Sequence, residues 1–225
     1  MKRLYHLAFI ILLAGAGSLQ NALAASEAAK DTLPPDPAAM FDQCAQFLKG
    51  QGVVFTRLEP FTTDKGCTIK DPVKVTGIFQ TNKTINLPAR PVLSCQFALR
   101  LAIWLADVSA PIIQDFQKSP LKAISSGPGY TCRNRYNRKN GKLSEHAYGN
   151  AIDINGFLLA NGKRIAVSEL TDGTGAQRRM LMALRVTSCG YFTTVLGPGA
   201  NSAHKDHFHL DLGKHGRTWN YRICE

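Results

Sequence analysis

The side chains best suited to chemistry gather near the C-terminus, where residues 204–212 read H-K-D-H-F-H-L-D-L. This stretch holds three of the chain's six histidines, interleaved with two aspartates: His204, Asp206, His207, His209 and Asp211. Imidazole nitrogens and carboxylate oxygens bind metal ions and transfer protons. The stretch is therefore a candidate metal site or proton relay, and the alternative is a polar surface strand.

A strand over residues 207–212 would divide these side chains between two faces, because successive side chains of a strand alternate. His207, His209 and Asp211 then share a polar face. The apolar residues between and after them share the other face, which suits a core. His204 precedes the strand in a loop.

A second polar segment lies upstream, where residues 144–156 read S-E-H-A-Y-G-N-A-I-D-I-N-G. Asp153 lies between two isoleucines of a short strand, and a buried carboxylate needs a partner. A turn at Gly149 would swing His146 back over that strand. His146, Asp153 and His209 then offer nitrogen and oxygen ligands to zinc, with a fourth position open for water, as in catalytic sites. The alternative is a hydrogen-bonded His–Asp pair without a metal.

The remaining pattern predicts elements that would position these segments. A short helix is expected near residues 44–48, and longer helices at 94–118 and 173–188. Strands are expected at residues 53–58, 67–70, 73–78, 122–133 (broken by Gly-Pro-Gly), 151–159 and 207–212. In the helix at 94–118, Ser94 is the expected N-cap, and Pro111 is expected to kink or end the helix. Strands separated by helices without strict alternation predict an α+β fold, with a central antiparallel sheet flanked by helices.

The N-terminus has the features of an export signal. Lys2 and Arg3 precede an apolar run too short to span a bilayer, followed by an A-L-A-A cleavage site. We expect a signal peptide at residues 1–24, with cleavage after Ala24 or, alternatively, Ala25. A linker is expected at residues 25–40 and one domain at 41–225, divided into an N-terminal extension (41–90) and a catalytic core (91–225). No further membrane span is expected, and no stable membrane insertion.

The mature chain contains six cysteines: Cys44, Cys67, Cys95, Cys132, Cys189 and Cys224. An even number in an exported chain predicts disulfides, and their spacing does not fit a zinc site. Six cysteines allow 15 pairings, so the choice between them is a hypothesis. We expect neighbours in sequence to pair, as Cys44–Cys67, Cys95–Cys132 and Cys189–Cys224.

The chain is basic, with a formal charge of +11, and removing Lys2 and Arg3 leaves +9. A basic exported protein meets anionic polymers and membrane surfaces, and export argues against nucleic acid as a partner. The alternative is that the charge only maintains solubility.

Two motifs resemble those of peptidoglycan peptidases. S-E-H-A-Y-G-N-A-I-D resembles the S-x-H-x-x-G-x-A-x-D motif of D-alanyl-D-alanine carboxypeptidases and dipeptidases and of the penicillin-insensitive murein endopeptidase. H-K-D-H-F-H is similar to the H-x-x-H-x-H end of that endopeptidase. G-C-T-I-K-D-P-V, Y-F-T-T-V-L-G-P-G and the terminal R-I-C resemble the bacterial extensin-like C-terminal domain family over roughly residues 40–225.

The resemblance implies zinc bound by His146, Asp153 and His209, an antiparallel sheet with helices outside, and cleavage of peptide bonds in murein cross-links. The endopeptidase type has histidines at the positions of His204 and His207. The carboxypeptidase type has a glutamate where this chain has Asp206. Strand alternation favours His207 as the base that activates water or as a group that stabilises the transition state. Asp206 is the alternative, either as base or as a partner that orients a histidine.

G-Y-T-C-R, residues 129–133, resembles a segment of the carboxypeptidases. It makes Arg133 a candidate to hold the oxyanion or a substrate carboxylate, with a solvated basic face as the alternative. Ser144, the motif serine, is expected to bond the aspartate or the substrate.

Together these features predict a zinc-dependent murein peptidase in the periplasm of a Gram-negative bacterium. Two alternatives are a non-catalytic peptidoglycan-binding or scaffold protein that retains the fold, and a zinc enzyme acting on another small substrate.

Overall fold

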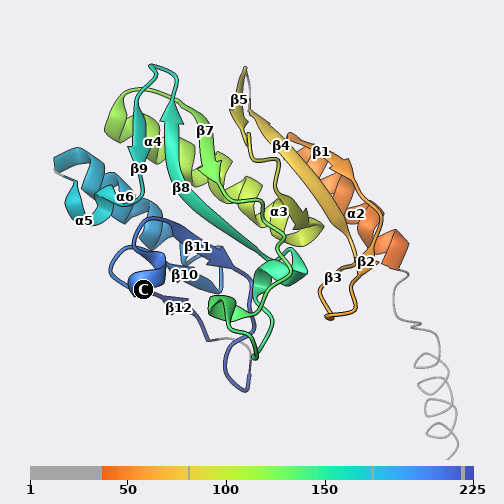
Figure 1. Cartoon of the computed structure of the whole chain (residues 1–225). Helices are drawn as coiled ribbons and strands as arrows, with labels where there is room; N and C mark the ends of the chain where they lie inside the picture. Colours follow the sequence, from red (N-terminus) through yellow and green to blue (C-terminus); the bar gives the residue numbers. More distant parts are fainter. Residues whose placement is uncertain (1–36, 81, 174, 219–220) are drawn as a thin grey trace, which may run out of the picture. The chain divides into compact units, whose positions relative to one another are not determined.

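The structure is a computed structural model that describes residues 37–80, 82–173, 175–218 and 221–225 (Figure 1). The predicted signal peptide at residues 1–24 lies outside the described residues, as does the predicted linker up to residue 36. Helix α2 begins at Pro37, inside the segment for which the sequence predicts a linker.

Helices and strands alternate irregularly along the chain. The helices are α2 (Pro37–Gly50), α3 (Cys95–Ile103), α4 (Ala110–Gln117), α5 (Glu169–Asp172) and α6 (Gly175–Ser188), with a π-helical turn η1 (Trp104–Ser109) and 3-10 turns η2 (Arg135–Asn137), η3 (Glu145–Tyr148) and η4 (Ser202–His204). The strands are β1 (Val53–Arg57), β2 (Phe61–Thr62), β3 (Thr68–Ile69), β4 (Pro72–Gln80), β5 (Lys83–Asn86), β6 (Val92–Ser94), β7 (Leu121–Ser126), β8 (Ala151–Leu159), β9 (Arg164–Ala166), β10 (Thr194–Leu196), β11 (Phe208–Asp211) and β12 (Ile223–Cys224). The α+β prediction is therefore confirmed.

Within the described residues, ten strands form one sheet in the order β1-β4-β5-β7-β8-β11-β10-β12, with β6 paired to β4 and β9 to β8. Most neighbours are antiparallel, but β5 runs parallel to β7 and β10 runs parallel to β12. The predicted central sheet flanked by helices is therefore present, but it is mixed and not antiparallel throughout. Between β5 and β7 the chain crosses over through the long α3–α4 helix, and such a crossover returns it in the same direction.

A layer of helices covers one face of the sheet. Helices α2, α3, α4 and α6 lie behind the sheet in the view of Figure 1. The core between the layers contains fully buried residues of the long helix, such as Phe97 and Trp104, and Ile152 and Ile154 of β8. These isoleucines direct one face of β8 toward the helices, so Asp153 between them is presented on the other face.

The long central helix continues past its proline. Ser94 caps α3 as predicted, because its Oγ accepts a hydrogen bond from the Phe97 backbone N–H at 3.3 Å. The π-helical turn η1 precedes α4, and the Ala110 N–H donates to the carbonyl of Leu105. This wider turn accommodates Pro111, which has no N–H and would crowd the preceding turn of a regular α-helix. The helix therefore ends at Gln117, and not at Pro111.

Among the described residues, the continuous helix Cys95–Gln117 has the length and composition of a membrane span, with a mean hydropathy of 1.4 in its most apolar window. Half of that window, 50%, is buried inside the domain. Phe97, Leu101 and Trp104 are buried in the hydrophobic core. The core helix of a globular domain has the same composition, and this helix packs as one.

Three disulfides join the six cysteines within the described part of the chain, in agreement with the prediction that all six pair: Cys44–Cys95, Cys67–Cys132 and Cys189–Cys224. The predicted pairs Cys44–Cys67 and Cys95–Cys132 are wrong. Packing decides the partners, because α2 lies against α3 and β3 lies against η3, which brings together cysteines distant in sequence. The three bonds indicate an extracytoplasmic location.

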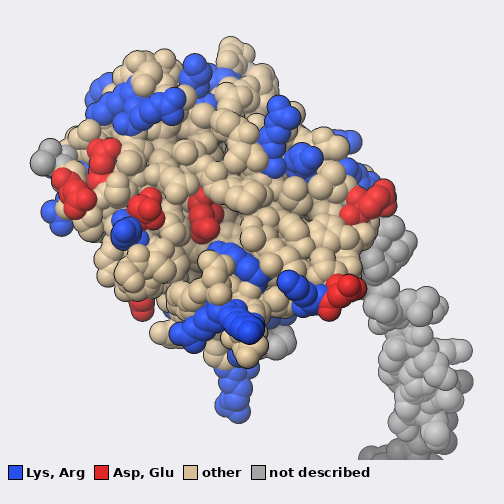
Figure 2. All heavy atoms as spheres, viewed as in Figure 1, with Lys and Arg blue, Asp and Glu red and all other residues tan. Residues whose placement is uncertain are grey.

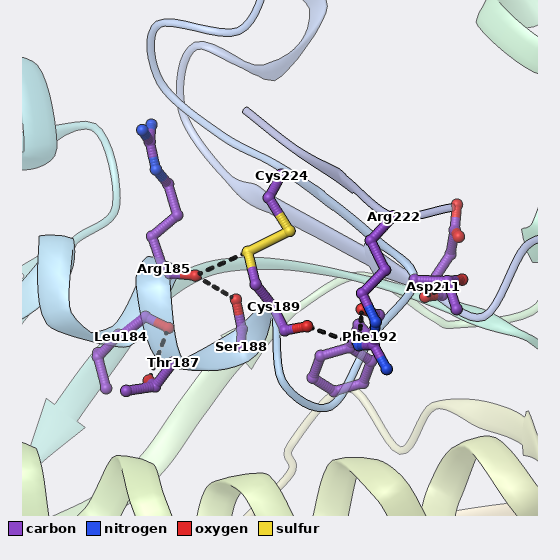
Figure 3. Close-up of a disulfide and its surroundings, with 10 residues drawn as sticks. Leu184, Arg185, Thr187, Ser188, Cys189, Phe192, Asp211, Arg222 and Cys224 are labelled. Carbon is purple, nitrogen blue, oxygen red and sulfur yellow. Dashed lines mark hydrogen bonds between the residues drawn. A yellow bond between two sulfur atoms is a disulfide. The ribbon is translucent and has the colours of Figure 1, made fainter. Parts of the chain in front are cut away.

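The predicted pair Cys189–Cys224 is confirmed and ties the end of α6 to β12 (Figure 3). Arg222 reinforces this link, because its Nη1 donates to the carbonyl oxygens of Cys189 at 2.6 Å and Phe192 at 3.0 Å. The disulfide and the arginine together hold β12 beside β10 at the edge of the sheet. Strand β10 in turn pairs with the histidine-rich strand β11.

Candidate metal centre

His146 is held by its own turn and by a glycine carbonyl. Ser144 caps η3, and its hydroxyl accepts a hydrogen bond from the His146 backbone N–H at 3.4 Å. The imidazole Nδ1 donates to the carbonyl oxygen of Gly129 at 2.6 Å, so Nε2 is the ring nitrogen that could bind a metal. Gly129 has φ +76°, and a Cβ there would meet the Val92 carbonyl oxygen at 2.6 Å. Only glycine at position 129 therefore allows its carbonyl oxygen to lie this close to the His146 ring.

The predicted turn at Gly149 follows η3 directly. Gly149 has φ +64°, and a Cβ on it would lie 2.7 Å from the backbone nitrogen of Ser94 and 2.6 Å from Cδ1 of Ile69. This left-handed turn returns the chain into β8, so that His146 and Asp153 meet although they lie in different elements.

Asp153 and His209 meet because they are directly paired residues of neighbouring strands, β8 and β11. The alternation predicted for the histidine-rich stretch is confirmed by Phe208 and Leu210, which are buried in the core. Strand β11 begins at Phe208 and ends at Asp211, so His207 precedes the strand and does not belong to it.

These three side chains form a cluster that could hold a metal ion. One potential ligand atom from each of His146, Asp153 and His209 lies within 4.8 Å of the others. His146 Nε2 is 3.3 Å from Asp153 Oδ2, and His209 Nδ1 is 2.9 Å from Asp153 Oδ1. His146 Nε2 is buried and finds no hydrogen-bond partner among the described residues. A buried lone pair without a donor is costly, and a cation would satisfy it.

Asp211 contacts the ring nitrogen of His209 that does not face Asp153. Its Oδ2 accepts a hydrogen bond from His209 Nε2 at 2.9 Å, and its Oδ1 accepts one from the Gly213 N–H at 2.8 Å. A proton on Nε2 leaves the Nδ1 lone pair of His209 directed toward Asp153 and the cluster. The sequence places Asp211 on the polar face of the strand, two residues after His209, but this spacing does not predict that Asp211 contacts the His209 ring.

His207 reaches the same cluster. Its Nδ1 donates to Asp206 Oδ1 at 2.9 Å, and its Nε2 lies 3.6 Å from Asp153 Oδ1. The Asp206 side chain is 60% exposed, and a hydrogen bond within the described residues joins it to His207. This contact suits a partner that orients the His207 ring.

His204 lies on η4, with its ring centroid 5.3 Å from that of His207 and 5.6 Å from that of His209. Its Nδ1 donates to Asn201 Oδ1 at 2.8 Å. Burial lowers its pKa to about 4, and the positive charges of His209, His207 and Arg133 act in the same direction. His204 is therefore neutral at neutral pH, with Nε2 as a hydrogen-bond acceptor.

The metal-free cluster traps a proton on His209. Burial alone would lower the pKa of His209, but hydrogen bonds to Asp153 and Asp211 outweigh it and raise the pKa to about 9. Burial would likewise raise the pKa of both carboxyls, yet their histidine partners hold it below the ordinary value. His209 is thus a cation that contacts both carboxylates, and a divalent metal would have to displace its proton.

A family model described as Extensin-like protein C-terminus matches residues 42–225. The chain belongs to this family. Neither a curated protein nor a solved structure matches the chain. The matched residues of the extensin-like domain include all three disulfides and every residue of the cluster.

The cluster of the extensin-like domain opens into a cleft of about 510 Å³. Asp153, His204, His207 and His209 line it, and so do the remaining predicted site residues, Arg133 and Ser144. The structure therefore brings Arg133 to the same cleft as the cluster. No described hydrogen bond joins Ser144 to Asp153, because its hydroxyl caps η3.

Two further residues of the extensin-like domain lie in this cleft and were not expected there. His215, the one mature-chain histidine outside the two polar segments, is half-buried, and its Nε2 lies 2.6 Å from Thr194 Oγ1. Glu145 is paired with Arg135 at 3.2 Å. Burial and the nearby charge of Asp211 raise the pKa of Glu145, although Arg135 opposes the shift. Spacing alone gave no signal for either contact.

Proposed function

We propose that this extensin-like domain is a zinc-dependent peptidase that hydrolyses peptide bonds of peptidoglycan. The observation that carries the proposal is the convergence of His146, Asp153 and His209, with a buried, unpartnered Nε2 on His146. Two imidazoles and one carboxylate are a ligand set of catalytic zinc sites, which keep a position open for water. All three residues lie in the two sequence motifs that resemble those of murein peptidases.

Zinc held by these ligands would lower the pKa of a water molecule and polarise the scissile carbonyl. The chain's own residues supply the remaining chemistry. His207 Nε2 accepts the proton of the attacking water, because Asp206 holds its Nδ1 proton, and passes it to the leaving amine nitrogen. Arg133 in the same cleft stabilises the negative charge that develops on the carbonyl oxygen.

The location that the disulfides indicate for this protein agrees with peptidoglycan as its substrate. The disulfides indicate an extracytoplasmic protein, and we propose export by the N-terminal signal peptide into the periplasm. The net charge of +11 on the full chain favours an anionic cell-wall polymer as partner.

The proposal is tested with mature protein, sacculi and two defined muropeptides, one cross-linked and one uncross-linked. We expect one bound zinc per chain and new fragments from the cross-linked substrate. Asp153→Ala and His209→Ala should lose both zinc and hydrolysis. Asp115→Ala, which removes a carboxylate that is 79% exposed on α4, is the matched control and should lose neither.

Full zinc binding and full hydrolysis in both ligand variants would refute the proposal. Zinc and murein binding without new fragments would instead identify a non-catalytic wall-binding protein.

A further inference from the structure

A hairpin at residues 133–143 forms one wall of the cleft. Its two arms are joined by an isolated antiparallel bridge between Asn134 and Leu143, and the Arg135 N–H donates to the Lys142 carbonyl oxygen at 3.0 Å. At its base, the Ser144 N–H donates to the Arg133 carbonyl oxygen at 3.0 Å. The hairpin is therefore attached directly to η3, the turn that carries the cluster histidine. We call residues 133–143 the basic hairpin.

The basic hairpin concentrates positive charge. Its cations are Arg133, Arg135, Arg138, Lys139 and Lys142, and its sequence contains no aspartate or glutamate. Residues 135–142 are all exposed. Figure 2 shows Lys and Arg side chains gathered on the lower part of this face, where Figure 1 draws the green loop that includes the hairpin. Of the five cations, Arg135 has an ion pair within the described residues, with Glu145 at 3.2 Å.

The tip of the basic hairpin is held in an uncommon backbone conformation. Tyr136 and Asn137 have backbone φ values of 56° and 54°. These lie in the left-handed region, which residues other than glycine seldom adopt. The Asn134 side chain fixes the tip, because its Nδ2 donates to the carbonyl oxygens of Arg138 at 3.0 Å and Lys139 at 3.3 Å. Strained backbone kept in place by such contacts is typical of functional loops.

This conformation displays an aromatic ring beside cations. The Tyr136 side chain is exposed, with 60% of its surface accessible, and the Arg138 guanidinium carbon lies 5.7 Å from its ring centroid. Arg133, Arg135, Tyr136 and Asn137 line the same cleft as the metal cluster. A ligand bound along the basic hairpin would therefore extend into the candidate site.

We propose that the basic hairpin binds the peptidoglycan strand of the substrate and holds it against the cleft. Tyr136 stacks on a sugar ring of the strand, and Arg138, Lys139 and Lys142 bind the free carboxylates of the stem peptides attached to it. The flat, exposed ring suits a sugar face, and a hairpin that carries five cations and no acidic residue of its own suits an anionic polymer. This inference rests on the proposed function, because it assigns the substrate class of the same site.

The experiment measures co-sedimentation of the full mature protein with purified sacculi at low and high salt. The test variants are Tyr136→Ala and the triple variant Arg138→Gln, Lys139→Gln, Lys142→Gln. The matched control removes three exposed lysines of β4, β5 and β7, as Lys74→Gln, Lys83→Gln and Lys122→Gln. All retain the cluster residues, so binding is measured independently of hydrolysis.

We expect the triple variant to bind sacculi about tenfold more weakly at low salt and to lose most of the salt dependence, as for a removed electrostatic contact. Tyr136→Ala should weaken binding at both salt concentrations, and the control should bind like the wild type. Equal binding by the triple variant and the control would overturn the inference. So would equally tight binding of the wild type to DNA or to anionic phospholipid vesicles.

The two proposals fail separately. Sacculus binding that depends on the basic hairpin, without any muropeptide release, would refute the peptidase and leave the hairpin as a wall-binding site. Muropeptide release together with hairpin-independent binding would refute the hairpin inference alone.

Discussion

Replacing Asp211 with asparagine tests how the fold prepares His209 to bind a metal. In the wild type, Asp211 Oδ1 accepts from the Gly213 N–H at 2.8 Å and Oδ2 accepts from His209 Nε2 at 2.9 Å. Asparagine has a single acceptor oxygen. If that oxygen keeps the Gly213 bond, the amide NH₂ faces Nε2, which must then become an acceptor. The imidazole proton moves to Nδ1, the atom that would bind the metal.

The size of the effect follows from the position of Asp211. Losing a partner that fixes a histidine ligand typically costs about 10- to 100-fold in metal affinity, or about 1.4 to 2.7 kcal/mol. We expect the upper half of this range, because Asp211 is 5% exposed and water cannot easily replace its carboxylate.

The assay is a zinc titration against a competing chelator, together with the ¹⁵N spectrum of the histidine rings, which reports the tautomer. Asp206→Asn is the matched control, because Asp206 makes a bond of the same 2.9 Å length to His207 but is 60% exposed. The control should bind zinc with nearly the wild-type affinity. A folded Asp211→Asn protein with wild-type affinity and Nε2 still protonated would refute the reasoning.

Three further predictions concern the scaffold and the metal-free state. Cys67→Ser with Cys132→Ser should lower the free energy of unfolding by about 4 kcal/mol in urea titrations, since the bond closes a separation of 65 residues; a loss below about 1 kcal/mol contradicts this. Gly149→Ala should destabilise the domain by at least 2 kcal/mol more, as an order of magnitude, than Gly162→Ala, because both have positive φ but only Gly149 is crowded; equal losses contradict it. In chelator-treated protein, the His209 pKa is raised from 6.5 to about 9, so its stabilising contribution is complete below pH 6.5 and is lost as the pH rises through 9. The melting temperature should therefore fall over that interval in the wild type but not in His209→Gln, and parallel profiles would contradict the assignment.

Local patterns predicted the parts of the site that depend on local geometry. Strand alternation separates His209 from Phe208 and Leu210, and Gly149 supplies the turn that the motif requires. The three residues that could hold a metal were also predicted from the sequence, partly through resemblance to known motifs. What it missed at the site is Asp211, whose role depends on which way the His209 ring turns, and ring orientation leaves no periodic signal.

The partners of two disulfides and the direction of one strand pair could not be predicted from the sequence. The disulfide partners of Cys44 and Cys67 depend on how α2 packs on α3 and how β3 packs on η3, and spacing carries no information about either contact. The direction of β5 relative to β7 depends on the crossover through the long helix, which similarity to antiparallel folds does not reveal. The π-helical turn that accommodates Pro111 is likewise a property of the packed helix.

The most direct test of a metal-dependent murein peptidase is a metal titration of chelator-treated protein in the presence of sacculi. Muropeptide release should be absent without metal and should rise to a maximum at about one zinc per chain, the stoichiometry of one catalytic site. Asp153→Ala should show no rise at any zinc concentration. Release that is unaffected by chelation, or no release at full zinc occupancy, would contradict the proposed function.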